Sequence, residues 1–182
     1  MSLSRRKFLA LSSTALISTA ALSHPARASI SQHPIERQLD LLHLHTGERL
    51  TTRYWEQGHY HADALSEINH FFRDHRNNQI AGIDPALLDS IHQLQQHLDY
   101  QGEIHIISGY RSPETNEKLR QQGRGVAKRS FHLQGRAIDL RLPKADLSDV
   151  RKAALALHNG GVGYYPNSNF LHLDTGRKRQ WG

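Results

Sequence analysis

Two histidines and one aspartate in this sequence have the spacing of metal ligands. His132 precedes Asp139 by seven residues, and Gly135 between them permits a tight turn that would bring both side chains to one side. His172, on a predicted neighbouring strand, supplies a second imidazole. Two imidazoles and one carboxylate, with a fourth position left for water, are typical of catalytic rather than structural zinc. Such a site lowers the pKa of its bound water toward about 7 and polarises a carbonyl, so the pattern predicts metal-assisted hydrolysis.

Each of these residues has an ordinary explanation when it is taken alone. His132 or His172 could be a surface histidine, and Asp139 could be a salt-bridged acid. The full string Ser-x-His-x-x-Gly-x-Ala-x-Asp, from Ser130 to Asp139, is far more specific than the spacing of two residues. The hypothesis of a zinc site therefore rests on the string and on the strand histidine that follows it.

With a preceding Gly-Tyr-Arg that ends at Arg111, this string resembles the zinc D-Ala-D-Ala peptidase family. That family shares its fold with the lysostaphin-type enzymes and the amino-terminal domain of hedgehog proteins. The resemblance implies that His132, Asp139 and His172 bind Zn²⁺. It also implies that Arg111 binds the scissile carbonyl oxygen or a substrate carboxylate, and a permanent charge with forked donors suits either task. The similarity runs from about Leu41 to Trp181, with further matching stretches at 44–48, 69–74, 107–112, 124–128 and 160–166.

The general base is where the sequence departs from the family pattern. Many relatives place a His or Glu two or three residues before the last ligand, but Asn169 and Phe170 occupy those positions here. Asp174 lies two residues after His172, on the same face if the segment is a strand. We therefore take Asp174 as the candidate for the base or for a carboxylate that orients His172. A structural role at the turn that follows it is the alternative.

Other histidines and a basic loop are weaker candidates. The pairs His43 with His45 and His59 with His61 could chelate, but neither has a third ligand in a recognisable context, and His70 and His75 have the wrong spacing for one helix face. The loop 122–129 contains Arg124, Lys128 and Arg129 and could hold an anionic substrate. A solvated loop is the alternative for this segment.

The amino-terminal segment carries most of the chain's excess positive charge. The whole chain of 182 residues has a formal net charge of +6, and residues 1–28 contain Arg5, Arg6, Lys7 and Arg27 but no acid. The remaining 19 basic and 17 acidic residues leave only +2, which removes most of the support for a nucleic-acid-binding function. The chain contains no cysteine, which excludes thiol catalysis and thiolate metal sites.

The same segment has the features of an export signal. The apolar stretch 8–22 is too short and too mildly hydrophobic to span a bilayer. It is preceded by the Arg5-Arg6 pair of a twin-arginine signal and followed by Ala26-Arg27-Ala28, which signal peptidase would accept. We predict a twin-arginine signal peptide over 1–28, cleaved after Ala28, export to the periplasm, and no membrane anchor in the mature form. A general secretory signal is the alternative.

The rest of the chain predicts a flexible lead-in over 29–38 and one α+β peptidase domain over 39–182. Strands and helices alternate without a strict βαβ repeat. With the resemblance, this predicts a hedgehog/DD-peptidase-like fold in which helices flank a central, mostly antiparallel sheet. The expected strands are 39–45, 49–55, 103–108, 137–142, 160–164 and 169–174, and the expected helices are 63–76, one starting at Pro85 behind an Asp84 cap, one from a Ser112 cap to 121, and 147–158.

The resemblance implies a periplasmic zinc metalloendopeptidase that hydrolyses peptide cross-links in peptidoglycan (murein). Within the family, the similarity to murein endopeptidases implies a preference for the 3-3 bond between two diaminopimelate residues over the D-Ala–diaminopimelate bond. A D,D-carboxypeptidase or dipeptidase on the same zinc site, or a non-catalytic murein-binding module, are the alternatives. The sequence indicates no oligomeric state.

Overall fold

The computed structural model describes residues 36–123 and 125–182, which form an eight-stranded sheet with four α-helices. The predicted signal peptide and its cleavage site, most of the predicted lead-in, and Arg124 lie outside the described residues. Within the described part, no helix has the length and apolar character needed to cross a membrane.

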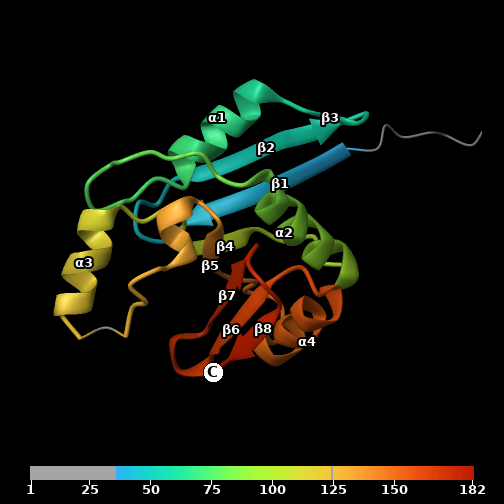
Figure 1. Cartoon of the computed structure of the whole chain (residues 1–182). Coiled ribbons are helices and arrows are strands. Elements are labelled where there is room, and N and C mark those ends of the chain that lie inside the picture. Colours follow the sequence, from blue (N-terminus) through green and yellow to red (C-terminus); the bar gives the residue numbers. More distant parts are fainter. Residues whose placement is uncertain (1–35, 124) are drawn as a thin grey trace, which may run out of the picture. The chain divides into compact units, whose positions relative to one another are not determined.

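The sheet is mixed and mostly antiparallel, as predicted (Figure 1). Only the pairs β1–β4 and β6–β8 are parallel. The strand order is β3-β2-β1-β4-β5-β7-β6-β8, so β4 and β5 are central. The strands are β1 Glu36–His43, β2 Arg49–Glu56, β3 His59–Tyr60, β4 Ile104–Ser108, β5 Ala137–Arg141, β6 Gly161–Tyr165, β7 Phe170–Asp174 and β8 Arg179–Trp181.

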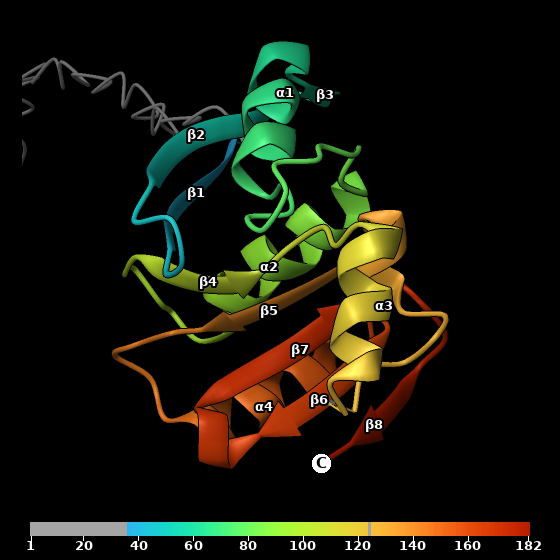
Figure 2. The ribbon, with the colours of Figure 1, turned by 90° about the vertical axis from the view of Figure 1, so that its left-hand side faces the viewer.

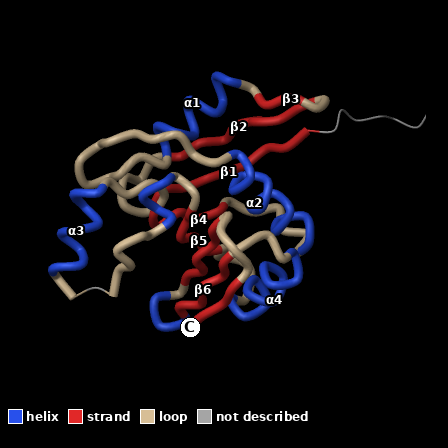
Figure 3. Tube along the Cα trace, viewed as in Figure 1, coloured by secondary structure: helices blue, strands red, loops and turns tan. Residues whose placement is uncertain are grey.

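Helices cover the two faces of the sheet unequally. The helices α2 (Pro85–His97) and α4 (Leu147–Leu157) pack against each other, and α4 packs on β6 and β7. Helix α1 (Ala62–Phe71) contacts β2. Helix α3 (Pro113–Gln121) lies on the opposite face from α2 and α4 (Figures 1 and 2). Besides α3, the face on this side carries loops, drawn in tan in Figure 3, and the short 3₁₀ helix Phe131–Gln134.

The starts of α2 and α3 agree with the prediction because their caps are local in sequence. Asp84 accepts a hydrogen bond from the Ala86 amide in front of α2, and Ser112 accepts one from the Thr115 amide in front of α3. The predicted helix 63–76 is too long, since α1 ends at Phe71. Asp74 instead accepts hydrogen bonds from the amides of Arg76 and Ser112, which favours a turn over a continued helix.

The strands also differ from the prediction, which did not include the two-residue strand β3. Strand β1 begins at Glu36, so residues 36–38 belong to the sheet and not to the lead-in. Strand β8 was not predicted, because Arg179–Trp181 is too short to show an alternating pattern and is held by pairing with β6.

Candidate metal centre

The side chains of His132, Asp139 and His172 meet at one point. Asp139 Oδ1 lies 2.8 Å from His172 Nδ1 and 3.3 Å from His132 Nε2, and the two imidazole nitrogens are 3.2 Å apart. All three residues are buried. Among the described residues, this is the one group of three or more histidines and acids whose ligand atoms come close enough to share an ion.

His132 is positioned by a single turn of 3₁₀ helix, Phe131–Gln134. The Ser130 side chain accepts a hydrogen bond from the His132 amide at its start. Gly135 ends the turn with a φ of 64°, and a Cβ there would collide with the Gly82 carbonyl. The sequence prediction that this glycine permits a tight turn is confirmed. The turn leaves the His132 Nδ1–H donating to the Gly109 carbonyl at 2.6 Å.

Asp139 and His172 are placed by strand register. They are directly paired across β5 and β7, so their side chains emerge from the same face. Alternation along β7 sends Leu171 and Leu173 into the core under the helices. The imidazole and the carboxylate therefore stand on the face that α2 and α4 leave uncovered.

Asp174 lies behind His172. Its Oδ2 is 3.1 Å from His172 Nε2, and both of its oxygens are engaged by Arg179, at 2.9 and 2.6 Å. The amides of Gly161 and Gly176 also donate to Oδ1. The carboxylate does not line the cleft above the three ligands. The general-base interpretation of Asp174 does not fit this geometry, whereas the interpretation as an orienting carboxylate does.

The hydrogen bonds indicate which ring nitrogen of each ligand histidine can face a metal ion. Because His132 donates from Nδ1 to Gly109, its Nε2 carries the lone pair. Without a metal, burial would lower the pKa of His172, but hydrogen bonds to Asp139 and Asp174 outweigh burial and raise that pKa. A metal ion that replaces the proton between Nδ1 and Asp139 would leave Nε2 donating to Asp174 and the Nδ1 lone pair facing the ion. Two nitrogen lone pairs and one carboxylate oxygen would then face the same point, where the three residues could hold a metal ion. Two imidazoles and one carboxylate are a donor set that fits Zn²⁺.

The pKa values of the two carboxylates, Asp139 and Asp174, also favour the binding of a cation. Burial would raise the pKa of Asp139, but the adjacent His132 and His172 outweigh it and hold that pKa well below its usual range. Burial would likewise raise the pKa of Asp174, and hydrogen bonds from His172 and Arg179 lower it instead. Both carboxylates are therefore ionised at neutral pH.

Arg111 reaches the same site from the end of β4. Its backbone amide donates to the His132 carbonyl at 3.1 Å, and its guanidinium lies in the cleft wall with 8% of the residue exposed. Its Nη1 has one long contact, 3.4 Å, to Asn116, and its Nε has no hydrogen-bond partner among the described residues. Burial lowers the pKa of this guanidinium. A buried cation with an unused donor is suited to binding an anionic group of a ligand.

A cleft of about 900 Å³ opens above the three ligands. Its described wall is cationic, with Arg111, Arg129, Arg177 and Arg179, and it is partly aromatic. Gly125 to Ala127 and Arg129 contribute from the basic loop, but Lys128 does not line the cleft and Arg124 lies outside the described residues. The aromatic side chains are Phe131, Tyr165, Phe170 and Trp181.

Sequence reasoning missed Arg179, Trp181 and Asp74. Arg179 and Trp181 reach the site through the unpredicted β8, and Asp74 fixes the loop after Arg111 by accepting from the Ser112 amide at 2.9 Å. None of the three has a local sequence signal, because each acts on a residue that is distant in the chain or belongs to a strand too short to recognise.

The other histidines do not form a comparable group. His75 joins the predicted pair His43 and His45, but the rings of His45 and His75 stack at 4.3 Å and do not converge on one point. His61 contacts Glu56 at 3.6 Å, and His59 contacts the Gln57 carbonyl.

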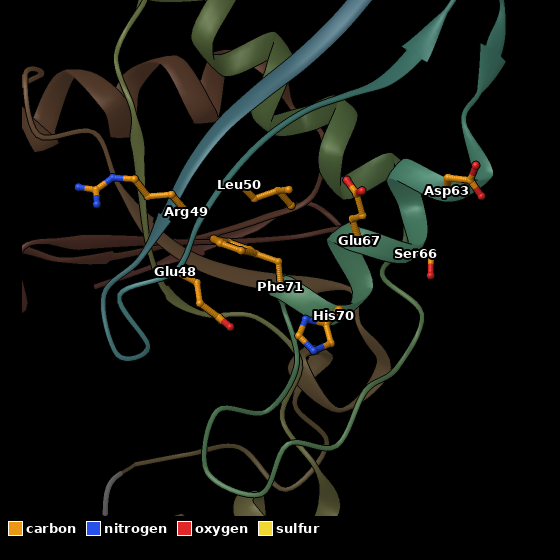
Figure 4. Close-up of a pocket in the computed structure, with 8 residues that line it drawn as sticks. All are labelled: Glu48, Arg49, Leu50, Asp63, Ser66, Glu67, His70 and Phe71. Carbon is orange, nitrogen blue, oxygen red and sulfur yellow. The ribbon is translucent and has the colours of Figure 1, made fainter.

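A second pocket lies between the start of β2 and α1 (Figure 4). It has a volume of about 570 Å³ and shares no lining residue with the cleft. Its wall carries both charge signs, and Glu48 there is paired with Arg73 at 2.9 Å. This pocket does not add to the chemistry of the metal centre.

A sheet that brings two imidazoles and a carboxylate to the floor of a cationic cleft has the arrangement of a metal-dependent hydrolase. The family model described as "Peptidoglycan L,D-endopeptidase MepK" matches residues 31–181, and the chain belongs to this peptidase family.

Curated relatives agree with the family match. The chain is 48% identical over 177 residues to the peptidoglycan L,D-endopeptidase MepK of Escherichia coli K12, with 97% of this chain and 96% of the relative covered. It is 40% identical over 178 residues to the probable peptidoglycan L,D-endopeptidase MepK of Haemophilus influenzae, with 97% and 95% covered. No solved structure gave a significant match.

Proposed function

We propose that this protein is a zinc-dependent endopeptidase that hydrolyses peptide cross-links of peptidoglycan. The observation that carries the proposal is the convergence of His132 Nε2, His172 Nδ1 and Asp139 Oδ1 within 3.3 Å of one another, below a cationic cleft. The printed names of the relatives supply the substrate class.

The residues of the chain take distinct roles in this proposal. His132, Asp139 and His172 hold Zn²⁺, which when bound activates water and polarises the scissile carbonyl. Arg111 binds the carbonyl oxygen as charge develops on it, or a substrate carboxylate. Asp174 holds the Nε2–H of His172 and so keeps the Nδ1 lone pair directed at the ion. Apart from the ligands, the described cleft wall contains no carboxylate or imidazole, so it supplies cations and aromatic rings.

The names of the relatives and the charge of the cleft favour one bond. A link between two meso-diaminopimelate residues joins an L centre to a D centre, whereas a D-Ala–diaminopimelate link joins two D centres. The relatives are named L,D-endopeptidases. A 3-3 link also presents free carboxylates near the scissile bond, which Arg111, Arg129 and Arg177 could bind. We infer that the 3-3 bond is the preferred substrate.

The proposed place of action is the periplasm. The twin-arginine pair and the small-residue cleavage site in residues 1–28 support export by the twin-arginine pathway and cleavage after Ala28. Determination of the amino-terminal sequence of protein purified from the periplasm tests this part. Recovery of the uncleaved chain from the cytoplasm alone would contradict it.

Cross-linked muropeptide dimers test the activity and the bond together. The exported protein should cleave diaminopimelate–diaminopimelate dimers faster than D-Ala–diaminopimelate dimers at matched concentration, with products identified by mass. A chelator should abolish cleavage and Zn²⁺ should restore it, while a His132→Ala, His172→Ala double variant should bind no metal. Equal rates on both dimers would contradict the bond choice, and release of terminal D-Ala alone would indicate a carboxypeptidase.

A further inference from the structure

The short strand β8 brings a cationic side chain, Arg179, and an aromatic side chain, Trp181, to the metal centre. It runs beside β6 (Figure 2), and Arg179 pairs in parallel register with Gly161 while Trp181 pairs with Gly163. The ring of Trp181 lies 5.2 Å from that of His172. The strand thus lies beside the β6–β7 pair that carries His172 and Asp174.

Arg179 binds the carboxylate that holds His172. Its Nη1 donates to Asp174 Oδ1 at 2.9 Å and its Nη2 to Oδ2 at 2.6 Å, a two-point contact that a planar guanidinium makes and an ammonium cannot. The Asp174 side chain is fully buried, so this ion pair is shielded from water on one side. A continuous chain of hydrogen bonds therefore runs from Arg179 through Asp174 to the Nε2 of His172.

The glycines of β6 make room for this contact. A Cβ at Gly161 would lie 2.5 Å from Asp174 Oδ2 and closer still to Arg179 Nη1. A Cβ at Gly163 would lie 2.6 Å from Trp181. The guanidinium is further enclosed by the rings of Phe131 and Trp181, at 5.2 and 4.9 Å from their centroids. Backbone, rings and carboxylate together fix the position of Arg179.

We propose that Arg179 is a positioning residue for the metal centre, which acts through Asp174 to fix the ring orientation and tautomer of His172. The inference rests on the proposed metallopeptidase function. Although Arg179 lines the cleft, both of its terminal nitrogens are already engaged by Asp174, and Nη1 also donates to the Arg177 carbonyl at 3.1 Å. Its effect is therefore on the ligand histidine and not on the substrate.

Three variants of the mature protein test the proposal. Arg179→Ala should weaken Zn²⁺ binding about tenfold, the lower end of the range for loss of a ligand's hydrogen-bond partner, because the partner Asp174 itself remains; chelator competition measures the affinity. Arg179→Lys should fall between Ala and the unsubstituted protein, since it keeps the charge but not the two-point contact. Lys178→Ala, an exposed neighbour that does not line the cleft, should match the unsubstituted protein.

Two further measurements separate positioning from a merely structural effect. In ¹⁵N spectra of metal-free protein, the signal of the His172 Nε2–H that donates to Asp174 should shift in Arg179→Ala and stay unchanged in Lys178→Ala. On muropeptide dimers, kcat should fall while KM changes little, whereas a substrate-binding arginine would mainly raise KM.

Unchanged Zn²⁺ affinity and an unchanged His172 spectrum in Arg179→Ala would overturn the proposal. If Arg179→Ala does not fold, Arg179→Lys decides by the same two measurements. Failure of the unsubstituted protein to cleave muropeptides would refute the proposed function instead, because the ¹⁵N measurement needs neither substrate nor metal.

Discussion

Arg111 combines burial, a permanent charge and an unused donor beside the ligands. Asp74 and the Ser112 cap of α3 fix the backbone directly after Arg111. The His132 carbonyl accepts a hydrogen bond from the Arg111 amide. The guanidinium is thus held before any substrate arrives, which is the condition under which a charged group contributes most to a transition state.

Arg111→Lys should therefore leave Zn²⁺ bound and lower turnover about a hundredfold, because an ammonium cannot reproduce the planar fork. Metal content and kcat on muropeptide dimers are the measurements. Arg120→Lys, on the exposed side of α3 in an ion pair with Glu117, is the control and should be unchanged. Near-normal turnover of Arg111→Lys would show that this residue only shapes the cleft wall.

The group His132, Asp139 and His172, which could hold a metal ion, was found from the sequence because His132 and Asp139 share one contiguous string with a required glycine. The role of Asp174 could not be resolved in the same way. The strand position of Asp174 beside His172 does not show which ring nitrogen of His172 the carboxylate faces. The orientation of the carboxylate depends on Arg179, which reaches Asp174 only because β8 pairs with β6.

At the scale of elements, the 3₁₀ turn that carries His132 depends on Gly135. Gly47 in the β1–β2 turn has a similar φ of 72°, but a Cβ there would touch nothing within 4 Å. Gly135 has a φ of 64° and faces the Gly82 carbonyl directly. The two glycines have a similar positive φ and differ in the space around them.

Gly47→Ala should cost about 1–2 kcal/mol of stability, the strain of a left-handed alanine. Gly135→Ala should cost clearly more and should also weaken Zn²⁺ binding, since the turn must move to clear Gly82. Urea unfolding and chelator competition on both variants measure the difference. Equal losses of stability with unchanged metal affinity would mean that the turn adapts without moving His132.

The helices and central strands were predictable because their signals are local. Caps and proline mark the starts of α2 and α3, and apolar spacing marks the buried side of α2. The end of α1 was predicted wrongly because Asp74 accepts a hydrogen bond from the amide of Ser112, 38 residues away, and this contact favours a turn over a longer helix. Elements whose limits are set by partners distant in sequence were the ones that sequence reasoning misplaced.

The cluster of His43, His45 and His75 makes the stability of the protein depend on pH. Burial lowers the pKa of His43 to about 4, and it lowers the pKa of His75 to about 4 as well. Both side chains would have a pKa near 6.5 in the unfolded chain. Between these values the unfolded state binds protons that the folded state does not, so stability is retained above pH 6.5 and is lost as the pH falls toward 4.

His75→Phe should reduce the slope of unfolding free energy against pH by about one proton between pH 6 and 5, because it keeps an aromatic ring over His45 and removes one titrating group. Urea unfolding of the metal-free proteins at several pH values measures the slope. The ligand histidines contribute equally to both proteins and cancel in the difference. Identical slopes would show that His75 already titrates normally in the folded state.

The turn between Asp174 and Arg179 joins β7, which carries His172, to β8, which carries Arg179. Arg177 and Lys178 in this turn are exposed and basic, which makes the peptide bonds after them suitable for a trypsin-like protease. One cut there would separate Arg179 from Asp174 in sequence and leave His132, Asp139 and His172 intact. Limited proteolysis could thus inactivate the centre while every metal ligand remains in the chain.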